Sequence, residues 1–113
     1  MAYFYKEKEI KFSDHPKFEG VKLAVLVDSS KNQEVSVSLL DIAPGVEIPI
    51  HTHEGQIDSI YVLSGQGEAY VNGAWQAIQG GDYIFVPVKE EHGVRNTGKD
   101  PLKLFVVHSP PLF

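Results

Sequence analysis

Two histidines separated by a single residue, His51 and His53, are the first sign of chemistry in this chain. They end the largely apolar run 46–53, and residues two apart in a strand project from the same face. Two imidazoles on one face supply half of a transition-metal site, which His92 and the carboxylate of Asp58 would complete. Taken alone, such a pair more often marks an exposed strand face, because most surface histidines bind nothing.

Strict alternation sorts the histidine run into two faces. One face carries Glu47, Pro49, His51 and His53. The other face is mostly apolar and carries Val46, Ile48, Ile50 and Thr52. In the next run, Asp58, Ile60 and Val62 share one face, and Ser59, Tyr61 and Leu63 share the other. No face is wholly polar, so we expect a barrel with a partly polar lumen and an outer surface covered by more protein.

Short apolar and alternating runs separated by turn residues predict strands along almost the whole chain. The run 21–27 is nearly all apolar and predicts a strand covered on both faces, whereas 35–39 alternates as a half-buried strand does. Asn72-Gly73 is the strongest hairpin signal in the sequence. About nine such segments indicate a sandwich or a barrel. Helical periodicity is absent, and the segment 13–16 is the one place where we expect a short helical turn to be capped.

Composition restricts the kind of protein and of partner. With 113 residues, 42% hydrophobic and 22% charged, the chain predicts one globular domain over residues 1–113. It contains no cysteine, which excludes disulfides, thiolate ligands and cysteine nucleophiles and fits a cytoplasmic protein. A net charge of −5 with dispersed basic residues argues against a nucleic-acid partner. We find neither a signal peptide nor an apolar run long enough to cross a membrane, and expect no membrane association.

The residues around the histidines resemble the two sequence motifs of the cupin family, small β-barrels that often hold a metal in the lumen. The first motif reads Gly, five residues, His, one residue, His, three or four residues, Glu, six residues, Gly. Residues 45–65 follow it with Gly45, His51, His53, Asp58 and Gly65. The second motif reads Gly, five residues, Pro, one residue, Gly, two residues, His, three residues, Asn. Residues 81–96 follow it with Gly81, Pro87, Lys89, His92 and Asn96.

The resemblance implies an all-β fold, a single-domain cupin-type barrel of the double-stranded β-helix or jelly-roll kind. It also implies that His51, His53 and His92 are metal ligands and that Asp58 stands in the carboxylate position. Asp58 is one methylene shorter than the usual Glu. Direct ligation, ligation through a water molecule and no ligation therefore all stay open, with Gln56 as a nearby amide that would replace it.

The predicted ligand set indicates a reactive centre rather than a structural one. Three neutral imidazoles and one carboxylate suit Fe(II), Mn(II), Ni(II), Cu(II) or Zn(II). On an octahedral ion they leave positions for water, oxygen or a chelating substrate. We expect a small metalloenzyme of oxygenase or isomerase type that acts on a small organic molecule. A non-catalytic module that binds or senses a small ligand is the alternative, and a barrel without metal is the third possibility.

Other residues carry weaker expectations. His15 is predicted to be solvated, and His108 to be a structural histidine, with a role in a pocket as the alternative. Lys89 replaces a glycine of the motif and leaves the shape of the loop before His92 open. Arg95 alternates to the face opposite His92 and is predicted to lie at the surface. Four aromatic residues are predicted to be core rather than pocket lining: Tyr61, Trp75, Tyr83 and Phe85.

The apolar faces and the resemblance together predict a homodimer. The histidine run presents Val46, Ile48 and Ile50 opposite the metal face, and the neighbouring run presents Tyr61 and Leu63. We do not expect one small barrel to cover all of this apolar surface, and large exposed patches usually mark an interface. Cupins commonly pair through their sheets, and two-fold association is the commonest form of homo-oligomer.

Overall fold

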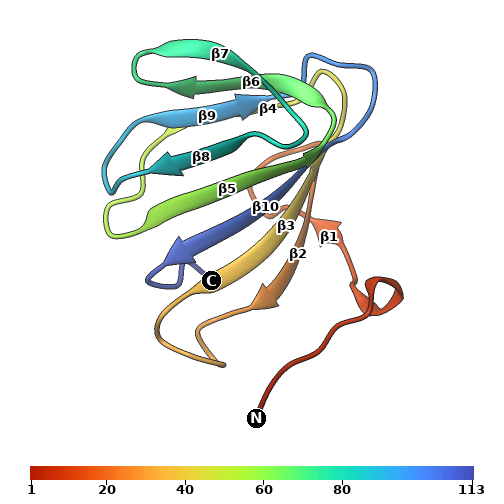
Figure 1. Cartoon of the computed structure of the whole chain (residues 1–113), viewed down its shortest axis with the longest axis vertical. Coiled ribbons are helices and arrows are strands. Elements are labelled where there is room, and N and C mark those ends of the chain that lie inside the picture. Colours follow the sequence, from red (N-terminus) through yellow and green to blue (C-terminus); the bar gives the residue numbers. More distant parts are fainter.

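The computed structural model describes all residues from Met1 to Phe113 and is built almost entirely of strands (Figure 1). Its helical content is the 3-10 turn Glu7–Glu9. The strands are β1 (Ser13–Asp14), β2 (Val21–Val27), β3 (Ser36–Ile42), β4 (Glu47–His51), β5 (Ile57–Ser64), β6 (Gln66–Val71), β7 (Ala74–Gln79), β8 (Tyr83–Val86), β9 (His92–Arg95) and β10 (Leu102–Ser109). The predicted all-β fold is confirmed. No helix has the length and apolar character needed to cross a membrane.

Two antiparallel sheets face each other and enclose the lumen of the barrel (Figure 1). The larger sheet has the strand order β1-β2-β3-β10-β5-β8, and the smaller has the order β4-β9-β6-β7. In the larger sheet β10 pairs with β3 on one side and with β5 on the other. Residues directly opposite each other on antiparallel neighbours lie close together, so this topology brings side chains of β3, β10 and β5 to the same level of the lumen.

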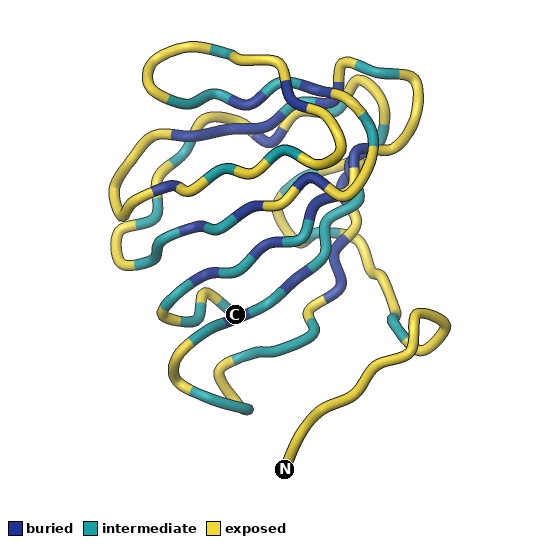
Figure 2. Tube along the Cα trace, in the orientation of Figure 1, coloured by how far each residue is buried: buried dark blue, intermediate teal, exposed yellow.

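Buried residues form one apolar core and alternate with more exposed residues along several of the strands (Figure 2). β10 shows this alternation clearly, with Leu102, Leu104 and Val106 buried and the residues between them half-buried or exposed. The core cluster has 12 buried residues and draws on both sheets. Burying one such side chain contributes about 1.5–3 kcal/mol, so the cluster is what holds the two sheets together.

The predicted turns are partly correct. The hairpin at Asn72-Gly73 is confirmed: β6 and β7 pair around these residues, whose φ angles of 53° and 81° suit a type I′ turn. The helical turn expected at 13–16 is wrong, because Ser13–Asp14 form β1. In place of a helix cap, the His15 Nδ1 accepts the backbone N–H of Lys17 at 3.0 Å and closes a tight turn.

Two expectations about which faces are covered are also wrong. The run 21–27 is a strand, but Val25 is 40% exposed, because an apolar run alone does not show whether both faces are covered. Tyr61, Tyr83 and Phe85, expected in the core, lie on the outer face of the larger sheet and are 44–57% exposed. Trp75 is half-buried on the smaller sheet, where the Arg95 guanidinium lies 4.0 Å from its ring centre. Arg95 also pairs there with Glu68 at 2.6 Å, which confirms its surface position.

β4 carries a bulge that strict alternation does not predict. Its register with β9 pairs Ile48 with Val94 and His51 with His92, so three steps on β4 match two on β9. The extra residue lies next to Pro49 in β4, which is an edge strand of the smaller sheet. Proline has no backbone N–H to donate to a neighbouring strand, so a bulge at this position costs few hydrogen bonds. Ile48, placed opposite the histidines by alternation, is therefore 6% exposed and part of the core. Ile48 and His51 both line the lumen.

Asn96, which closes the second motif, ties together the loops at the end of β9 opposite His92. It is 3% exposed. Its Nδ2 donates to the carbonyl oxygens of Ile42 and Asp100 at 2.9 and 2.8 Å, and its Oδ1 accepts the N–H of Gly98 at 2.9 Å. One side chain thus joins the end of β3 to the loop between β9 and β10 through three hydrogen bonds.

Asn96→Ala should lower the free energy of unfolding by about 2–4 kcal/mol, because three hydrogen bonds of about 1 kcal/mol each are lost and buried backbone groups keep no partner. Urea unfolding followed by Trp75 fluorescence measures the change. The exposed neighbour provides the control, and Thr97→Ala should stay within about 0.5 kcal/mol of the wild type. A cost for Asn96→Ala as small as that of the control would contradict this role.

Candidate metal centre

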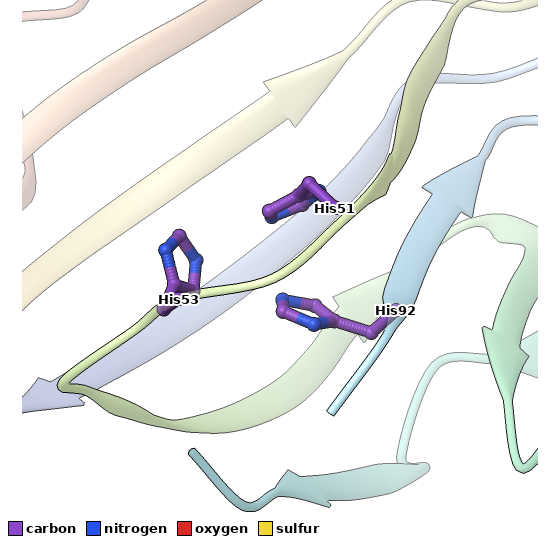
Figure 3. Close-up of side chains that lie close together, drawn as sticks. All are labelled: His51, His53 and His92. Atoms are coloured by element: carbon purple, nitrogen blue, oxygen red, sulfur yellow. The ribbon is translucent and has the colours of Figure 1, made fainter. Parts of the chain in front are cut away.

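Three imidazoles converge at one level of the lumen, as the motif spacing predicts (Figure 3). His51 ends β4, His53 follows in the loop, and His92 begins β9. The ring centres lie 4.9 Å apart for His51 and His53, 4.3 Å for His51 and His92, and 5.3 Å for His53 and His92. One ligand atom from each lies within 4.8 Å of the others. Two ligand atoms of one ion with bonds of about 2.0–2.2 Å are at most about 4.4 Å apart, so small movements of the rings would let one ion bind all three.

Backbone carbonyl groups fix the tautomers of two of these rings. The Nδ1 of His51 lies 2.7 Å from the carbonyl oxygen of Pro49, and the Nδ1 of His92 lies 3.0 Å from that of Glu90. A carbonyl oxygen only accepts, so each Nδ1 carries a proton and donates it. In the neutral ring each Nε2 is then left with a lone pair, which is the form of imidazole that binds a metal.

Asp58, on β5, brings a carboxylate against these rings. It is 4% exposed, and its Oδ2 lies 2.8 Å from the Nε2 of His92 and 3.5 Å from that of His53. The buried Nε2 of His92 nevertheless makes no aligned hydrogen bond. A nitrogen lone pair and a carboxylate oxygen repel each other at this distance unless a proton or a metal ion lies between them. Ligands about 2.1 Å from an octahedral ion are about 3 Å apart, so these residues fit a divalent metal.

Burial and short contacts set the charges of the cluster. Burial alone would raise the pKa of the Asp58 carboxyl, but contacts from His108, His53 and His92 hold that pKa far below its usual range. Burial lowers the pKa of His51. Burial acts in the same direction on His92, but the contact with Asp58 outweighs it and raises the pKa of that ring. At neutral pH an anionic carboxylate and a neutral His51 imidazole therefore face the lumen.

His108 also reaches the cluster, although the sequence favoured a purely structural role for it. It is 6% exposed, lines the same cavity, and holds its Nε2 2.6 Å from the Oδ1 of Asp58. His53, Asp58 and His108 form a second group whose ligand atoms lie within 4.8 Å of one another. The strand pattern contains the signal that was missed, because His108 continues the inward alternation of Leu102, Leu104 and Val106.

Two other expectations about the site residues need correction. Gln56, the amide considered as a replacement for Asp58, turns away: its Nε2 donates to the carbonyl oxygen of Pro111 at 3.4 Å, and it does not line the cavity. His15, expected to be solvated, is half-buried and lines the cavity beside Phe18, with the two ring centres 4.7 Å apart. Of Asp58 and Gln56, Asp58 is the one whose side chain lines the cavity beside the imidazoles.

Lys89 keeps a left-handed turn where the family motif has glycine. Its φ is 66°, a conformation that costs a residue with a side chain roughly 1–2 kcal/mol. Its N–H donates to the carbonyl oxygen of His53 at 2.9 Å. That bond joins the segment carrying His53 to the loop that leads into His92, so the turn helps to position two of the three imidazoles.

The cluster opens into a small cavity of about 90 Å³. Nine of its 16 lining residues are hydrophobic, and none is lysine or arginine. Phe18 contributes from the N-terminal segment, and Leu112 and Phe113 contribute from the segment after β10. A water molecule has a share of about 30 Å³ in the liquid, so the cavity suits a molecule of only a few heavy atoms.

The Cupin domain family matches residues 38–108, which is more than half of the chain. The chain therefore belongs to the cupin family, as the motifs predicted. It is similar to an oxalate-binding protein of Thermotoga maritima, with 34% identity over 68 residues that cover 60% of this chain and 56% of that protein. It is also similar to auxin-binding protein 1 of Arabidopsis thaliana, with 32% identity over 70% of this chain and 44% of that protein. The match spans about half the length of these two relatives.

Solved structures support the same fold. A protein described as a predicted oxalate decarboxylase from Thermotoga maritima superposes with a TM-score of 0.85 and 26% identity, covering 96% of this chain and 99% of that one. The polyketide cyclase RemF from Streptomyces resistomycificus superposes with a TM-score of 0.83 over 100% of this chain and 87% of its own. At 21% identity, RemF is a likeness of fold alone.

Proposed function

We propose that this cupin binds one divalent transition metal through His51, His53, Asp58 and His92 and acts on a small molecule that chelates the ion. The convergence of three imidazoles whose ligand atoms lie within 4.8 Å of one another, with the Asp58 Oδ2 2.8 Å from the His92 Nε2, carries the proposal. A metal ion bound there would take the place of the proton that otherwise lies between the His92 and Asp58 atoms. Divalent iron, manganese, nickel, copper and zinc all accept such a ligand set.

The residues around the proposed ion fit a reactive centre. When bound, such an ion supplies a Lewis acid that polarises oxygen atoms of a ligand, and open positions for that ligand. With a metal bound, the imidazoles of His51 and His92 would give their Nε2 lone pairs to the ion, and Asp58 would lower the net charge of the site. Leu112, Phe113 and the other apolar residues of the lining exclude bulk water, which strengthens every electrostatic interaction in the cavity.

The cavity favours a very small chelating anion. No lysine or arginine lines it, so the negative charge of a ligand would be balanced by the ion alone. A two-carbon dicarboxylate suits the cavity of about 90 Å³ and offers two oxygen atoms to one ion. The relative from Thermotoga maritima that is 34% identical is called an oxalate-binding protein. Oxalate is therefore the ligand that we propose to test first.

Binding without turnover is the second candidate. Both relatives described above carry names that refer to binding rather than to a reaction. Within the cavity, Asp58 is the one carboxylate, and the proposed metal takes it as a ligand, so no free carboxylate is left as a general base. Under this alternative the same metal and the same ligand are held, and no bond of the ligand is broken.

Calorimetric titration of oxalate into the manganese-loaded protein should give saturable binding with one oxalate per chain, because the open positions of the ion accept two oxygen atoms. The metal-free protein should bind no oxalate. Succinate, too long for the cavity, serves as the matched control and should bind more weakly. Equal binding by the loaded and metal-free proteins would contradict the proposal. Formate and carbon dioxide released on incubation in air would distinguish turnover from binding.

We also propose that two copies pair through the outer face of the larger sheet. The register aligns Leu39, Phe105, Tyr61 and Tyr83 in one row across β3, β10, β5 and β8. Tyr61 and Tyr83 are 44% and 57% exposed, and this row contains no charged side chain. Because the chain carries a net charge of −5, an uncharged face is where two copies meet without repulsion. Ile48 of the histidine run, buried in the core, contributes nothing to this face.

Light scattering at micromolar concentration should give a mass twice the 12.5 kDa of one chain. Tyr61→Lys should return the mass to that of a single chain, because it places two like charges at the centre of the proposed interface. Gln76→Lys, an exposed position on the smaller sheet, should leave the dimer intact and serves as the control. A wild-type mass of one chain would reject the dimer.

A further inference from the structure

His108 stands at a level of the lumen where an apolar residue would be expected. The three inward positions before it on β10 are Leu102, Leu104 and Val106, all of them core residues. Its register partners are Asp58 on β5 and Ser36 on β3, the latter completely buried. The small Ser36 leaves room for an imidazole. A buried imidazole without a polar partner is costly, so this position calls for an explanation in terms of its contacts.

The His108 ring packs beside His53 and Phe113, and its charged partner is one oxygen atom of Asp58. Its Nε2 lies 2.6 Å from the Oδ1 of Asp58, while its buried Nδ1 makes no hydrogen bond. Nε2 is the ring atom that faces Oδ1, so a proton carried on Nε2 would point at the carboxylate. In the neutral form of His92 the proton instead lies on Nδ1, which donates to a carbonyl oxygen, so Nε2 is the atom left to bind a metal. The two rings therefore present Nε2 to Asp58 in different roles.

The two oxygen atoms of Asp58 are thereby assigned to different partners. Oδ1 faces His108, and Oδ2 faces the Nε2 atoms of His92 and His53 at 2.8 and 3.5 Å. Asp58 is one methylene shorter than the Glu of the family motif, so its carboxylate has less reach and fewer ways to turn toward an ion. A donor behind Oδ1 fixes the plane of the carboxylate and directs Oδ2 at the imidazoles.

We propose that His108 is a positioning residue of the metal centre, which holds Asp58 through Oδ1 so that Oδ2 is presented to the ion. The inference rests on the proposed metal site. Its rival is direct ligation, because His53, Asp58 and His108 also lie within ligand distance of one another. Under the positioning role His108 acts only through Asp58, and its effect disappears when Asp58 is removed.

The experiment measures cobalt(II) affinity by competition with a chelator, on the full chain, for His108→Leu, His108→Gln, Asp58→Ala and the double variant Asp58→Ala with His108→Leu. His108→Leu should weaken binding about 10–100-fold, the usual effect of removing a partner of a metal ligand. His108→Gln keeps an N–H donor and should recover most of the affinity. In the Asp58→Ala background, His108→Leu should have no further effect, since the residue through which it acts is absent.

The visible spectrum of bound cobalt provides a second readout that packing alone would not change. The spectrum of His108→Leu should shift toward that of Asp58→Ala, because both lose the carboxylate ligand. Thr97→Ala, at an exposed position outside the cavity, is the control and should leave the affinity unchanged. Thermal unfolding of each metal-free variant shows whether it is folded.

The possible results separate the inference from the proposed function. A wild-type protein that binds no cobalt overturns both. Wild-type binding with an unchanged affinity in His108→Leu overturns the positioning role and leaves the metal site standing. A further loss of affinity on adding His108→Leu to Asp58→Ala also overturns it, in favour of His108 as a ligand in its own right. Loss in His108→Leu, recovery in His108→Gln and no further loss in the double variant support it.

Discussion

Asp58 is a buried carboxylate in a lumen lined mostly by apolar residues, and the rest of the site is arranged around it. An ionised carboxylate without partners in such surroundings would be strongly destabilising. Here imidazoles approach both of its oxygen atoms, and their contacts hold its pKa low. The rings in turn need polar partners, which the carbonyl groups of Pro49 and Glu90 supply for two of them. Nitrogen and oxygen atoms that could bind a cation are thus collected in a cavity whose other lining residues are mostly apolar.

Two irregularities of the backbone make this arrangement possible. A regular β4 could not point both Ile48 and His51 into the lumen, and the bulge beside Pro49 allows it to do so. The left-handed turn at Lys89 brings its N–H to the carbonyl oxygen of His53 and so connects the first motif to the second. Both irregularities lie next to histidines of the proposed metal site. Backbone strain and interrupted strand pairing are found most often at functional sites, where they position side chains.

The fold was predictable because the signals that define it are local. Alternation, the Asn72-Gly73 turn and the two motifs lie within short windows of sequence, and they lead to the correct all-β barrel. What could not be predicted depends on register between distant strands. Alternation within 46–53 does not reveal a bulge that exists only in the pairing with β9. The contact of His108 with Asp58 likewise arises because β10 pairs with β5, although the inward parity of His108 could have been read from its own strand.

The central claim is that His51, His53, His92 and Asp58 hold one divalent metal ion per chain. Elemental analysis of protein purified without chelators tests it most directly, with His92→Ala and the exposed Thr52→Ala compared with the wild type. We predict close to one transition-metal ion per chain in the wild type and in Thr52→Ala, and a marked loss in His92→Ala, because a buried ligand of the centre is removed. An unchanged metal content in a folded His92→Ala, or no metal in the wild type after incubation with each candidate ion, would contradict the account.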